Sequence, residues 1–457
     1  MRFQPASLDA LNFLLADVRG ALGPYLNVFL VTQQHWSQSS VGVLTTLGGL
    51  IALTVQTPIG AAIDATHAKR LLIILPLAVL ALGAVAIYTL PVFWPVMIAN
   101  AVVAVVGDVF GPAVAALTLG LYARRELAHR MGRNAAFDHA GNVAIAAAAG
   151  VVGWIFSQRA VFLLAPVFAT LAAVSVLTIP AGAIDHERAR GADDVAAKQQ
   201  PRAGSPVWQV LCGCRPLLIY GICTALFHLA NAPLLPLVGQ KLAESHHDLA
   251  TAMMSACIIA AQLIMLPIAV AVGRSADRIG RKRILLIGFG VLPLRAVLYT
   301  LSDQAWWLIG VQLLDGIGAG IFGAITPLVI ADFMRGTGRY NLAQGGIATL
   351  QGIGASSSGL LAGEIVDRLG YSPAFLASGA IAAAAFLLLA LALPESAAGT
   401  PARLPRMLRG VASSRVTSGR AIPTGVIARS AATKQSRARP ACNNDRDCFP
   451  RPSPASQ

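Results

Sequence analysis

Four charged residues stand inside long apolar stretches of this chain: Asp17, Arg19, Asp108 and Asp315. A charge at the centre of a lipid bilayer costs at least about 2.5–3.5 kcal/mol on insertion scales, so a charge kept there is a candidate functional group. A carboxyl in a wet cavity of low dielectric can bind and release a proton, and an arginine can hold an anion. These four residues are therefore candidates for proton coupling and for substrate binding.

The alternative to a functional role is structural pairing. Asp17 and Arg19 lie about 200° apart around a helix, so they are poor partners for each other and each is expected to reach a neighbouring helix. Asp108 with Arg19 is a candidate cross-helix pair. For proton coupling we expect Asp17 first and Asp108 next. His228 and Asn231 are polar residues of a further apolar run and join the candidate set.

The elements that carry these residues are long apolar runs. The 457-residue chain is 56% hydrophobic and only 12% charged, whereas soluble domains carry about 25% charged residues. Each run is long enough to cross a bilayer, which takes about 20 residues. The sequence thus predicts an all-α membrane protein with twelve transmembrane helices. We expect them at residues 9–31, 40–62, 71–90, 95–121, 138–157, 160–182, 216–239, 250–272, 284–301, 305–332, 342–365 and 373–393.

The runs divide the chain into four parts. Two six-helix bundles are expected at residues 1–182 and 216–393, joined by a polar cytoplasmic linker at 183–215. The tail, 394–457, is rich in Arg, Ser, Ala and Pro and is expected to be disordered. The tail is interpreted as a read-through extension without function; the alternative is a basic arm that holds anionic lipid, at about 1 kcal/mol per basic residue.

The net charge of +14 would suit nucleic-acid binding, but its placement argues against that function. The tail alone holds eleven Lys and Arg against three acidic residues. Most other basic residues fall in loops expected on one side of the membrane, and the positive-inside rule makes that side the cytoplasm. We therefore expect an inner-membrane protein with both termini in the cytoplasm. The loop residues in question are Lys69, Arg70, Arg124, Arg125, Arg130, Arg133, Arg335 and Arg339.

A short charged segment between two of the apolar runs has a specific sequence pattern. The stretch GRSADRIGRKR fits G-x-x-x-D-R-x-G-R-K at every position and is expected to form a tight turn at the water interface. It resembles the signature loop of the major facilitator superfamily. The matching residues are Gly273, Asp277, Arg278, Gly280, Arg281 and Lys282.

The two halves of the chain resemble each other. A weaker copy of the motif keeps Gly60, Asp64, Lys69 and Arg70 but lacks the Arg and Gly that follow the Asp. Asp64 and Asp277 are 213 residues apart, and the similar segments FLLAD and FHLAN, which end at Asp17 and Asn231, are 214 apart. Matches in register indicate a six-plus-six duplication, as in transporters built from parallel repeats.

The resemblance implies a secondary transporter that works by alternating access. In the family, helices 1, 4, 7 and 10 line a central cavity, which would hold Asp17, Arg19, Asp108, His228, Asn231 and Asp315. It also implies that Asp277 biases the outward-open state, so that Asp277→Asn should reduce transport. The motif residues of both loops are thus expected to act in gating.

We expect proton-coupled export of a small organic molecule. The alternatives are proton-coupled uptake of a small organic anion held by Arg19, or a non-transporting sensor or membrane enzyme on the same scaffold. The sequence offers no nucleophile–base pair on the spans and no cysteine spacing typical of zinc, so we expect no enzyme, no metal and no cofactor. The expected partners are a small-molecule substrate, protons and the lipid bilayer, and the expected state is a monomer.

Overall fold

Every regular element in the described part of the chain is a helix. The computed structural model describes residues 4–16, 22–66, 68–189, 207–245, 247–335, 337 and 339–396. In that part, nine helical segments are long and apolar enough to cross a membrane. The predicted all-α membrane fold is therefore confirmed.

Three of the twelve expected spans fall outside these nine for identifiable reasons. In the first, residues 17–21 lie outside the described residues, so no stretch of sufficient length is described there. The ninth, Arg281–Leu298, begins with three basic residues and contains Arg295. The eleventh, Tyr340–Leu369, is rich in Gly, Ser and other polar residues, which lowers its mean hydropathy.

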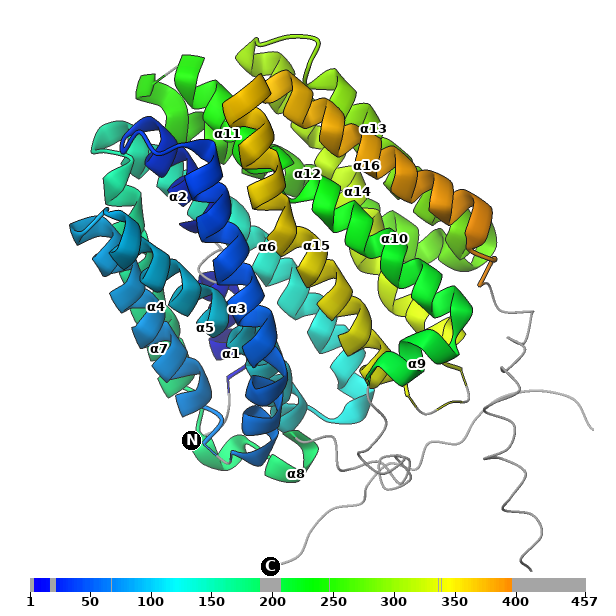
Figure 1. The fold of residues 1–457 in the computed structure, drawn as a ribbon. Coiled ribbons are helices and arrows are strands. Elements are labelled where there is room, and N and C mark those ends of the chain that lie inside the picture. The colour runs from blue at the N-terminus through cyan, green and yellow to red at the C-terminus, as the bar shows by residue number, and fades with distance from the viewer. Residues whose placement is uncertain are drawn as a thin grey trace, which may run out of the picture. The chain divides into compact units, whose positions relative to one another are not determined.

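The first half of the chain forms one helical bundle (Figure 1). In chain order its elements are α1 (Pro5–Leu15), α2 (Leu22–Thr32), α3 (Gln38–Ala65), α4 (Leu71–Thr89), α5 (Phe93–Leu121), α6 (Arg124–Ile155), η2 (Arg159–Leu163) and α7 (Leu164–Leu177). The short elements η3 (Ala181–Ala183), α8 (His186–Ala189) and α9 (Val207–Gly213) follow.

The second half repeats this arrangement. Its elements are α10 (Arg215–Asn231), α11 (Leu234–Ser245), η5 (His247–Leu249), α12 (Ala250–Ile279), α13 (Arg281–Leu298), α14 (Ala305–Phe333), α15 (Tyr340–Leu369) and α16 (Tyr371–Ala392). α9, expected in the linker, instead contributes Val210 and Leu211 to the core of this second bundle.

Each bundle has its own hydrophobic core. One core draws only on residues between Leu8 and Ile184, and the other only on residues between Val210 and Leu393. A third, small cluster is shared by both halves and includes Tyr25, Val28 and Met254. Each bundle is therefore built around its own core, and the buried cluster that they share is small.

Two glycine turns define the ends of the helices. Gly280 (φ 95°) joins α12 to α13, and Gly370 (φ 88°) joins α15 to α16. A positive φ is costly for residues with a Cβ, so glycine permits both reversals. Because successive spans alternate in direction, α4, α6, α13 and α15 all begin at one end, called here the Gly280 end. The opposite end is called the Gly370 end.

The structure corrects the expected bounds of the fifth span. We expected it to begin at residue 138, but α6 begins at Arg124. Arg130 and Arg133, expected in a loop, therefore lie on a helix, and both pair with Asp9 of α1, at 2.7 and 2.6 Å. The apolar pattern could not reveal this extension, because the added turns carry charged residues, two of which pair with Asp9.

The expected loop at residues 273–283 is also largely helical. α12 continues to Ile279 and α13 starts at Arg281, so the turn is confined to Gly280. Gly273 and Arg278 consequently lie on α12. The charged residues misled the prediction because a helix can extend past the bilayer into water.

The seventh expected span is divided into two helices, α10 and α11. The break falls at Ala232 and Pro233, where the missing N–H of proline interrupts the helical ladder. In the first expected span the structure describes α1 and α2, and the residues between Ala16 and Leu22 lie outside the described part.

Candidate functional site

The bundles are fastened together at the Gly370 end by the carboxylate of Asp367, on the last turn of α15. Its Oδ1 accepts the backbone N–H of Gln38 at 2.9 Å, and its Oδ2 accepts that of Ser39 at 2.7 Å. These are the first N–H groups of α3, which have no partner within their own helix. Ser37 Oγ accepts the N–H of Ser40 at 3.2 Å. Asp367 is thus an N-terminal cap supplied by the other bundle, called here the Asp367 clasp.

The electrostatics of the clasp favour the ionised carboxylate. Asp367 lies beyond the expected span at 342–365, at the rim of the structure. Burial works against its charge, but the hydrogen bonds from Ser39 and Gln38 lower the pKa of Asp367 below its ordinary value. A negative charge is also favoured at the positive end of a helix.

Tyr371 adds a second link at the same end. Its hydroxyl accepts a hydrogen bond from Gln38 Nε2 at 3.1 Å and donates one to Glu244 Oε1 at 2.6 Å. The tyrosine therefore connects α3 of the first bundle with α11 and α16 of the second.

Close helix packing continues the contact below the clasp. α3 meets α15 at Gly42 and Gly359, where a Cβ on Gly42 would clash with the Gly359 carbonyl oxygen. α6 meets α12 at Gly153, where a Cβ would clash with Thr251. Small residues at such positions let two helix backbones approach closely.

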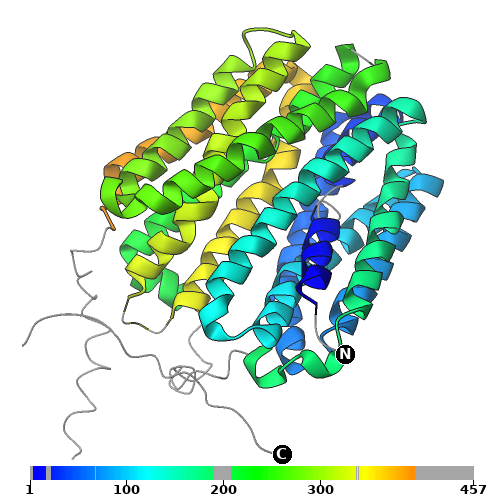
Figure 2. The same cartoon turned by 180° about the vertical axis from the view of Figure 1, so that it is seen from behind.

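Toward the Gly280 end the same helices separate. Among the described residues, the hydrogen bonds and glycine contacts between the bundles fall at 38–53 on α3 and 352–367 on α15. On α6 and α12 they extend only as far as His139 and Gln262, whose side chains are 2.8 Å apart. Figures 1 and 2 show α3 diverging from α15, and α6 from α12, beyond these points.

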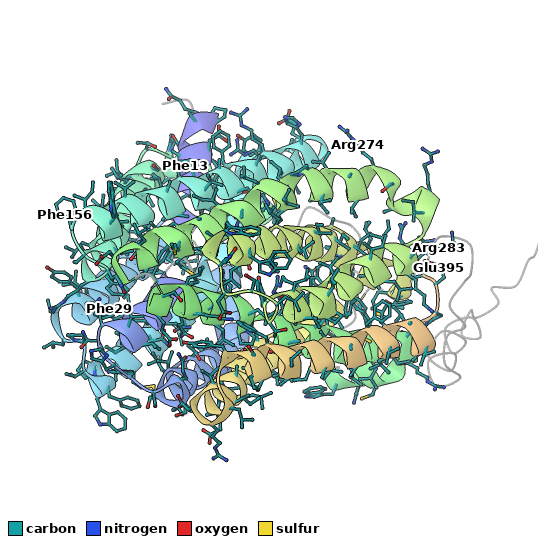
Figure 3. The ribbon with its side chains drawn as sticks, turned by 90° about the horizontal axis from the view of Figure 1, so that it is seen from above. Phe13, Phe29, Phe156, Arg274, Arg283 and Glu395 are labelled. Carbon is teal, nitrogen blue, oxygen red and sulfur yellow. The ribbon has the colours of Figure 1, made fainter. Side chains whose placement is uncertain are left out.

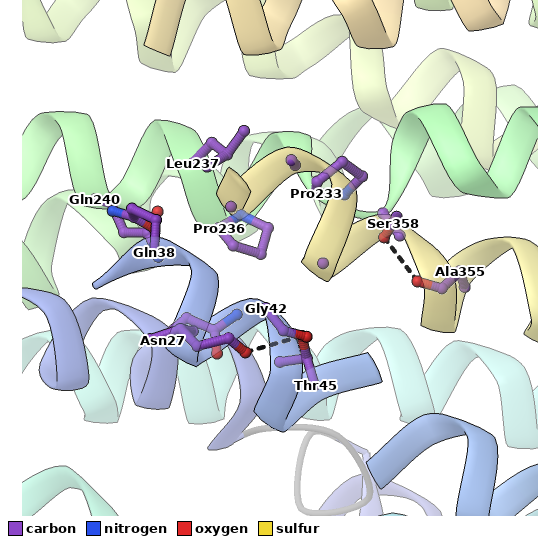
Figure 4. A pocket seen from close by; sticks show the side chains of 15 residues that line it. Asn27, Gln38, Gly42, Thr45, Pro233, Pro236, Leu237, Gln240, Ala355 and Ser358 are labelled. Atoms are coloured by element: carbon purple, nitrogen blue, oxygen red, sulfur yellow. Dashed lines mark hydrogen bonds between the residues drawn. The ribbon is translucent and has the colours of Figure 1, made fainter. Parts of the chain in front are cut away.

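A pocket lies just below the Asp367 clasp, between the two bundles (Figure 4). It has a volume of about 190 Å³. α3 and Asn27 of α2 form one side, and Ala232–Gln240 and α15 form the other. Its polar lining residues are Asn27, Gln38, Thr45, Gln240 and Ser358.

Two of these polar residues lack a partner. Asn27 is 8% exposed and Gln240 is 2% exposed. The carbonyl oxygens of both side chains make no hydrogen bond within the described part of the chain. Buried polar groups are normally satisfied, so an unused pair in a pocket indicates a missing partner.

Comparison with known proteins decides the family. The model of the Major Facilitator Superfamily matches residues 8–274 and 217–440. The chain belongs to this superfamily. It is therefore a multi-pass membrane transporter, as the motif at Gly280 indicates.

The relatives of the chain belong to the same superfamily. Two uncharacterized MFS-type transporters of Mycobacterium tuberculosis, MT2531 of strain CDC 1551 / Oshkosh and Rv2456c of strain ATCC 25618 / H37Rv, are each 46% identical over 390 residues. The alignment covers 85% of this chain and 93% of each relative. The fold resembles the crystal structure of a mutant of the nucleoside transporter NupG, with a TM-score of 0.70 at 13% identity, over 84% of this chain and 98% of that one.

Motif residues of this MFS transporter whose contacts the structure describes contact their own bundle. Arg281 Nε lies 2.8 Å from Asp332 Oδ2 on α14. The backbone N–H of Lys282 donates to Glu395 Oε1 at 3.2 Å, and Figure 3 labels Glu395 next to Arg283. Of the remaining motif residues, Gly273 has open space around it, Arg278 is exposed and Lys69 is buried.

One basic residue of each motif contacts the end of the last helix of its own bundle. Arg70 Nη2 donates to the carbonyl of Leu177 at 3.0 Å, at the end of α7. Lys282 Nζ donates to the carbonyl of Ala390 at 2.7 Å, at the end of α16. Both therefore cap the last helix of their own bundle, where a cation is favoured.

The remaining motif residues are Gly60, Asp64 and Asp277. At these three positions the structure describes only the helical backbone of α3 and α12. The side chains lie outside the described part, so the gating role of these residues stays a prediction.

Asp315 belongs to a buried network inside the second bundle. It forms an ion pair with Arg295 of α13, which is 2% exposed. Arg295 Nη2 donates to Asn231 Oδ1 at 2.6 Å, and Gln312 Nε2 donates to Asp315 Oδ2 at 3.2 Å. Tyr299 donates its hydroxyl to Gln312. The network ties three helices together and neutralises Asp315.

The other candidates are placed differently. His228 Nδ1 lies 2.9 Å from the Thr224 carbonyl oxygen, and its ring packs edge-on against Phe322. Asp108 is half-buried on α5 and has no hydrogen-bond or ion-pair partner in the described part of the chain. Asp17 and Arg19 lie outside the described residues, so the expected Asp108–Arg19 pair stays a prediction.

Sequence reasoning missed the residues that join the bundles. Asp367 stands at the end of an expected span and reads as an ordinary interfacial acid. Asn27 and Gln240 are single amides in or beside apolar runs, which more often satisfy each other across helices. His139, a titratable residue at the start of the expected fifth span, was likewise not singled out, and its side chain lies 2.8 Å from Gln262 of the other bundle.

Proposed function

We propose that this MFS transporter exports a small organic molecule by alternating access, in exchange for protons, and that the structure is its inward-facing state. The observation that carries the proposal is the one-sided contact between the bundles. The pairs α3–α15 and α6–α12 are fastened toward the Gly370 end and diverge toward the Gly280 end. Alternating access requires such an end-state.

The distribution of basic residues supports the orientation. Arg70, Arg281 and Lys282 lie at the Gly280 end together with Arg130 and Arg133. Under the positive-inside rule this end faces the cytoplasm, which also places both termini there. The transporter would accordingly lie in the inner membrane, closed toward the outside. We propose that it acts as a monomer.

The environment of Asp108 supports proton coupling. An ionised carboxylate without a cation is costly at membrane depth, whereas its protonated form is not. Asp315 differs because Arg295 already balances its charge. Asp108 has no counter-charge among the described residues. Proton binding would therefore relieve a larger cost at Asp108 than at Asp315. Asp17 remains the first candidate from the sequence.

The proton cycle gives the proposed direction. A proton that leaves Asp108 toward the cytoplasm leaves an unpaired carboxylate in the inward-facing state. The transporter then binds solute and turns to its outward-facing state. There it releases the solute, binds a new proton and returns inward. The inward proton gradient drives this exchange cycle. Exchange of this kind exports the solute.

The test measures the two ends of the bundles at once. Paramagnetic label pairs are placed at the exposed Met131 and Ile279 for the Gly280 end, and at the exposed Trp154 and Leu249 for the Gly370 end. The background lacks the six native cysteines. In nanodiscs, a change from alkaline to acidic buffer should shorten one distance and lengthen the other. Distances that never change in opposition would overturn the proposal in favour of a non-transporting scaffold.

A further inference from the structure

We infer that the pocket below the Asp367 clasp binds a small uncharged solute rich in hydroxyl or amide groups. The inference rests on the proposed transport function and names its substrate class. It is carried by the volume of the pocket, its two unpartnered carboxamides and the chemistry of its lining.

The volume suits a small molecule. At about 190 Å³ the pocket exceeds by several-fold the share of one water molecule, which is roughly 30 Å³. A cavity of about 150 Å³ is known to hold benzene, so this one has room for roughly eight to ten non-hydrogen atoms. A single water or a bare ion would leave most of the space unfilled.

The unpartnered groups define the hydrogen bonds that the solute must make. Asn27 and Gln240 are buried, and each has an unused side-chain oxygen in the described structure. Leaving such a group without a partner costs free energy, which a bound donor recovers. A carboxamide has one hydrogen-bond acceptor and two donors, and a hydroxyl group of the solute can bond to either kind. Ser358, 3% exposed, and Thr45 extend the polar lining.

The lining also selects for an uncharged molecule. The lining residues that the structure describes include Asn, Gln, Ser and Thr, and none of them is acidic or basic. The neighbouring Lys241 directs its Nζ to Asp303 Oδ1, at 2.5 Å. A charged solute would lose its hydration without gaining a counter-charge, whereas a neutral one would not.

The position of the pocket couples occupancy to the transport cycle. Asn27 belongs to the first bundle and Gln240 to the second, so a solute that bonds to both spans the boundary. Gln38 lines the pocket and is also held by the Asp367 clasp. Opening the Gly370 end separates the two carboxamides and breaks the bridge. The solute is then released at that end, as export requires.

The first experiment compares three solutes of matched size on the purified full-length chain in nanodiscs. Ribitol is neutral, ribonate is an anion and 1-amino-1-deoxyribitol is a cation; binding is measured calorimetrically and by the rise in thermal unfolding temperature. We expect ribitol to bind at least about tenfold more tightly than either charged solute. Stronger binding of ribonate or of the aminoribitol, or no binding of ribitol, would overturn the inference.

The second experiment tests the site. Asn27→Leu and Gln240→Met keep side-chain size and remove the hydrogen bonds, so each should weaken binding about tenfold. Gln344→Met, on an exposed residue of α15 at the Gly280 end, is the matched control and should bind as the native chain does. Gln240→Glu should shift the preference toward the aminoribitol. Ser358→Ala, a smaller change, serves if the first variants fold poorly, and native affinity in that variant and in Gln240→Glu would overturn the site.

The two proposals fail separately. Loss of binding in Asn27→Leu with opposed distance changes still driven by pH would support the site and leave the transport mechanism standing. Native binding in the variants, with the distance changes intact, would overturn the site alone. Ribitol-dependent stabilisation that needs Asn27, in a chain whose two ends never move in opposition, would overturn the transport mechanism alone.

Discussion

The carboxylate of Asp367 accepts a hydrogen bond of 2.7 Å from the backbone N–H of Ser39, across the boundary between the two bundles. A helix N-terminus is usually capped by a residue that precedes it in the chain. Here a residue more than 300 positions away completes the cap, so the first turn of α3 is satisfied only while the Gly370 end is closed. This relationship makes the cap a measure of the conformational state.

Asp367→Asn should favour opening of the Gly370 end. The variant loses one acceptor oxygen and the charge at the positive end of α3, at a cost of about 1 kcal/mol, as for other N-terminal caps at exposed sites. The label pair at Trp154 and Leu249 should then report a larger open fraction. Glu364→Gln is the control, because Glu364 pairs only with Arg368 of its own helix. An unchanged distance distribution in Asp367→Asn would show that the clasp does not hold this end closed.

Asp367 itself should contribute to the clasp through neutral pH and lose its contribution only in strong acid. Because the pKa of Asp367 is lowered in the closed state, its contribution is fully present above the ordinary carboxyl pKa and is lost as pH falls through the lowered value. Titration of the Trp154–Leu249 distance in the native chain should therefore show opening at the acid end of the range. Asp367→Asn should lack that step. A step near neutral pH that depends on Asp367 would contradict this assignment.

Gly42→Ala should prevent full closure of the Gly370 end. A Cβ at Gly42 meets the carbonyl oxygen of Gly359, which cannot move aside without shifting α15. Gly323→Ala on α14 is the matched control, since nothing lies within 4 Å of a Cβ there. Alkylation of an introduced Ser39→Cys by a membrane-impermeant maleimide should be faster with Gly42→Ala and unchanged with Gly323→Ala. Equal rates in both would exclude a tight α3–α15 contact.

Asp108→Asn should uncouple the conformational cycle from protons. The amide imitates the protonated acid, so the response of the Met131–Ile279 distance to pH near neutrality should disappear, and accumulation of solute against its gradient with it. Exchange of solute should continue, because the asparagine variant still cycles. Asp303→Asn, at an exposed acid paired with Lys241, should keep the native response. If Asp108→Asn also keeps it, Asp17→Asn becomes the next test.

Asp315→Asn should destabilise the protein rather than uncouple it. The change leaves the guanidinium of the buried Arg295 without its counter-charge, at a cost of about 3 kcal/mol in the free energy of unfolding. Arg295→Met combined with Asp315→Asn should cost less than the sum of the single changes, because neither charge is then left alone. Denaturant titration in mixed micelles measures both. Additive losses would show that the two side chains do not interact.

The sequence by itself determined the fold class, the duplication and the family. Apolar runs of bilayer length and a charged motif at Gly280 depend on local composition, so they can be read along the chain.

Only the tertiary structure decided which polar residues meet. Asp108 and Asp315 look alike in sequence, but Arg295 reaches one and no described residue reaches the other. Asp367 and Ser39, and Asn27 and Gln240, are more than 200 positions apart, so no spacing rule relates them. Their roles arise from the packing of one bundle on the other, which depends on close backbone approach at Gly42 and Gly359 and not on hydrophobic periodicity.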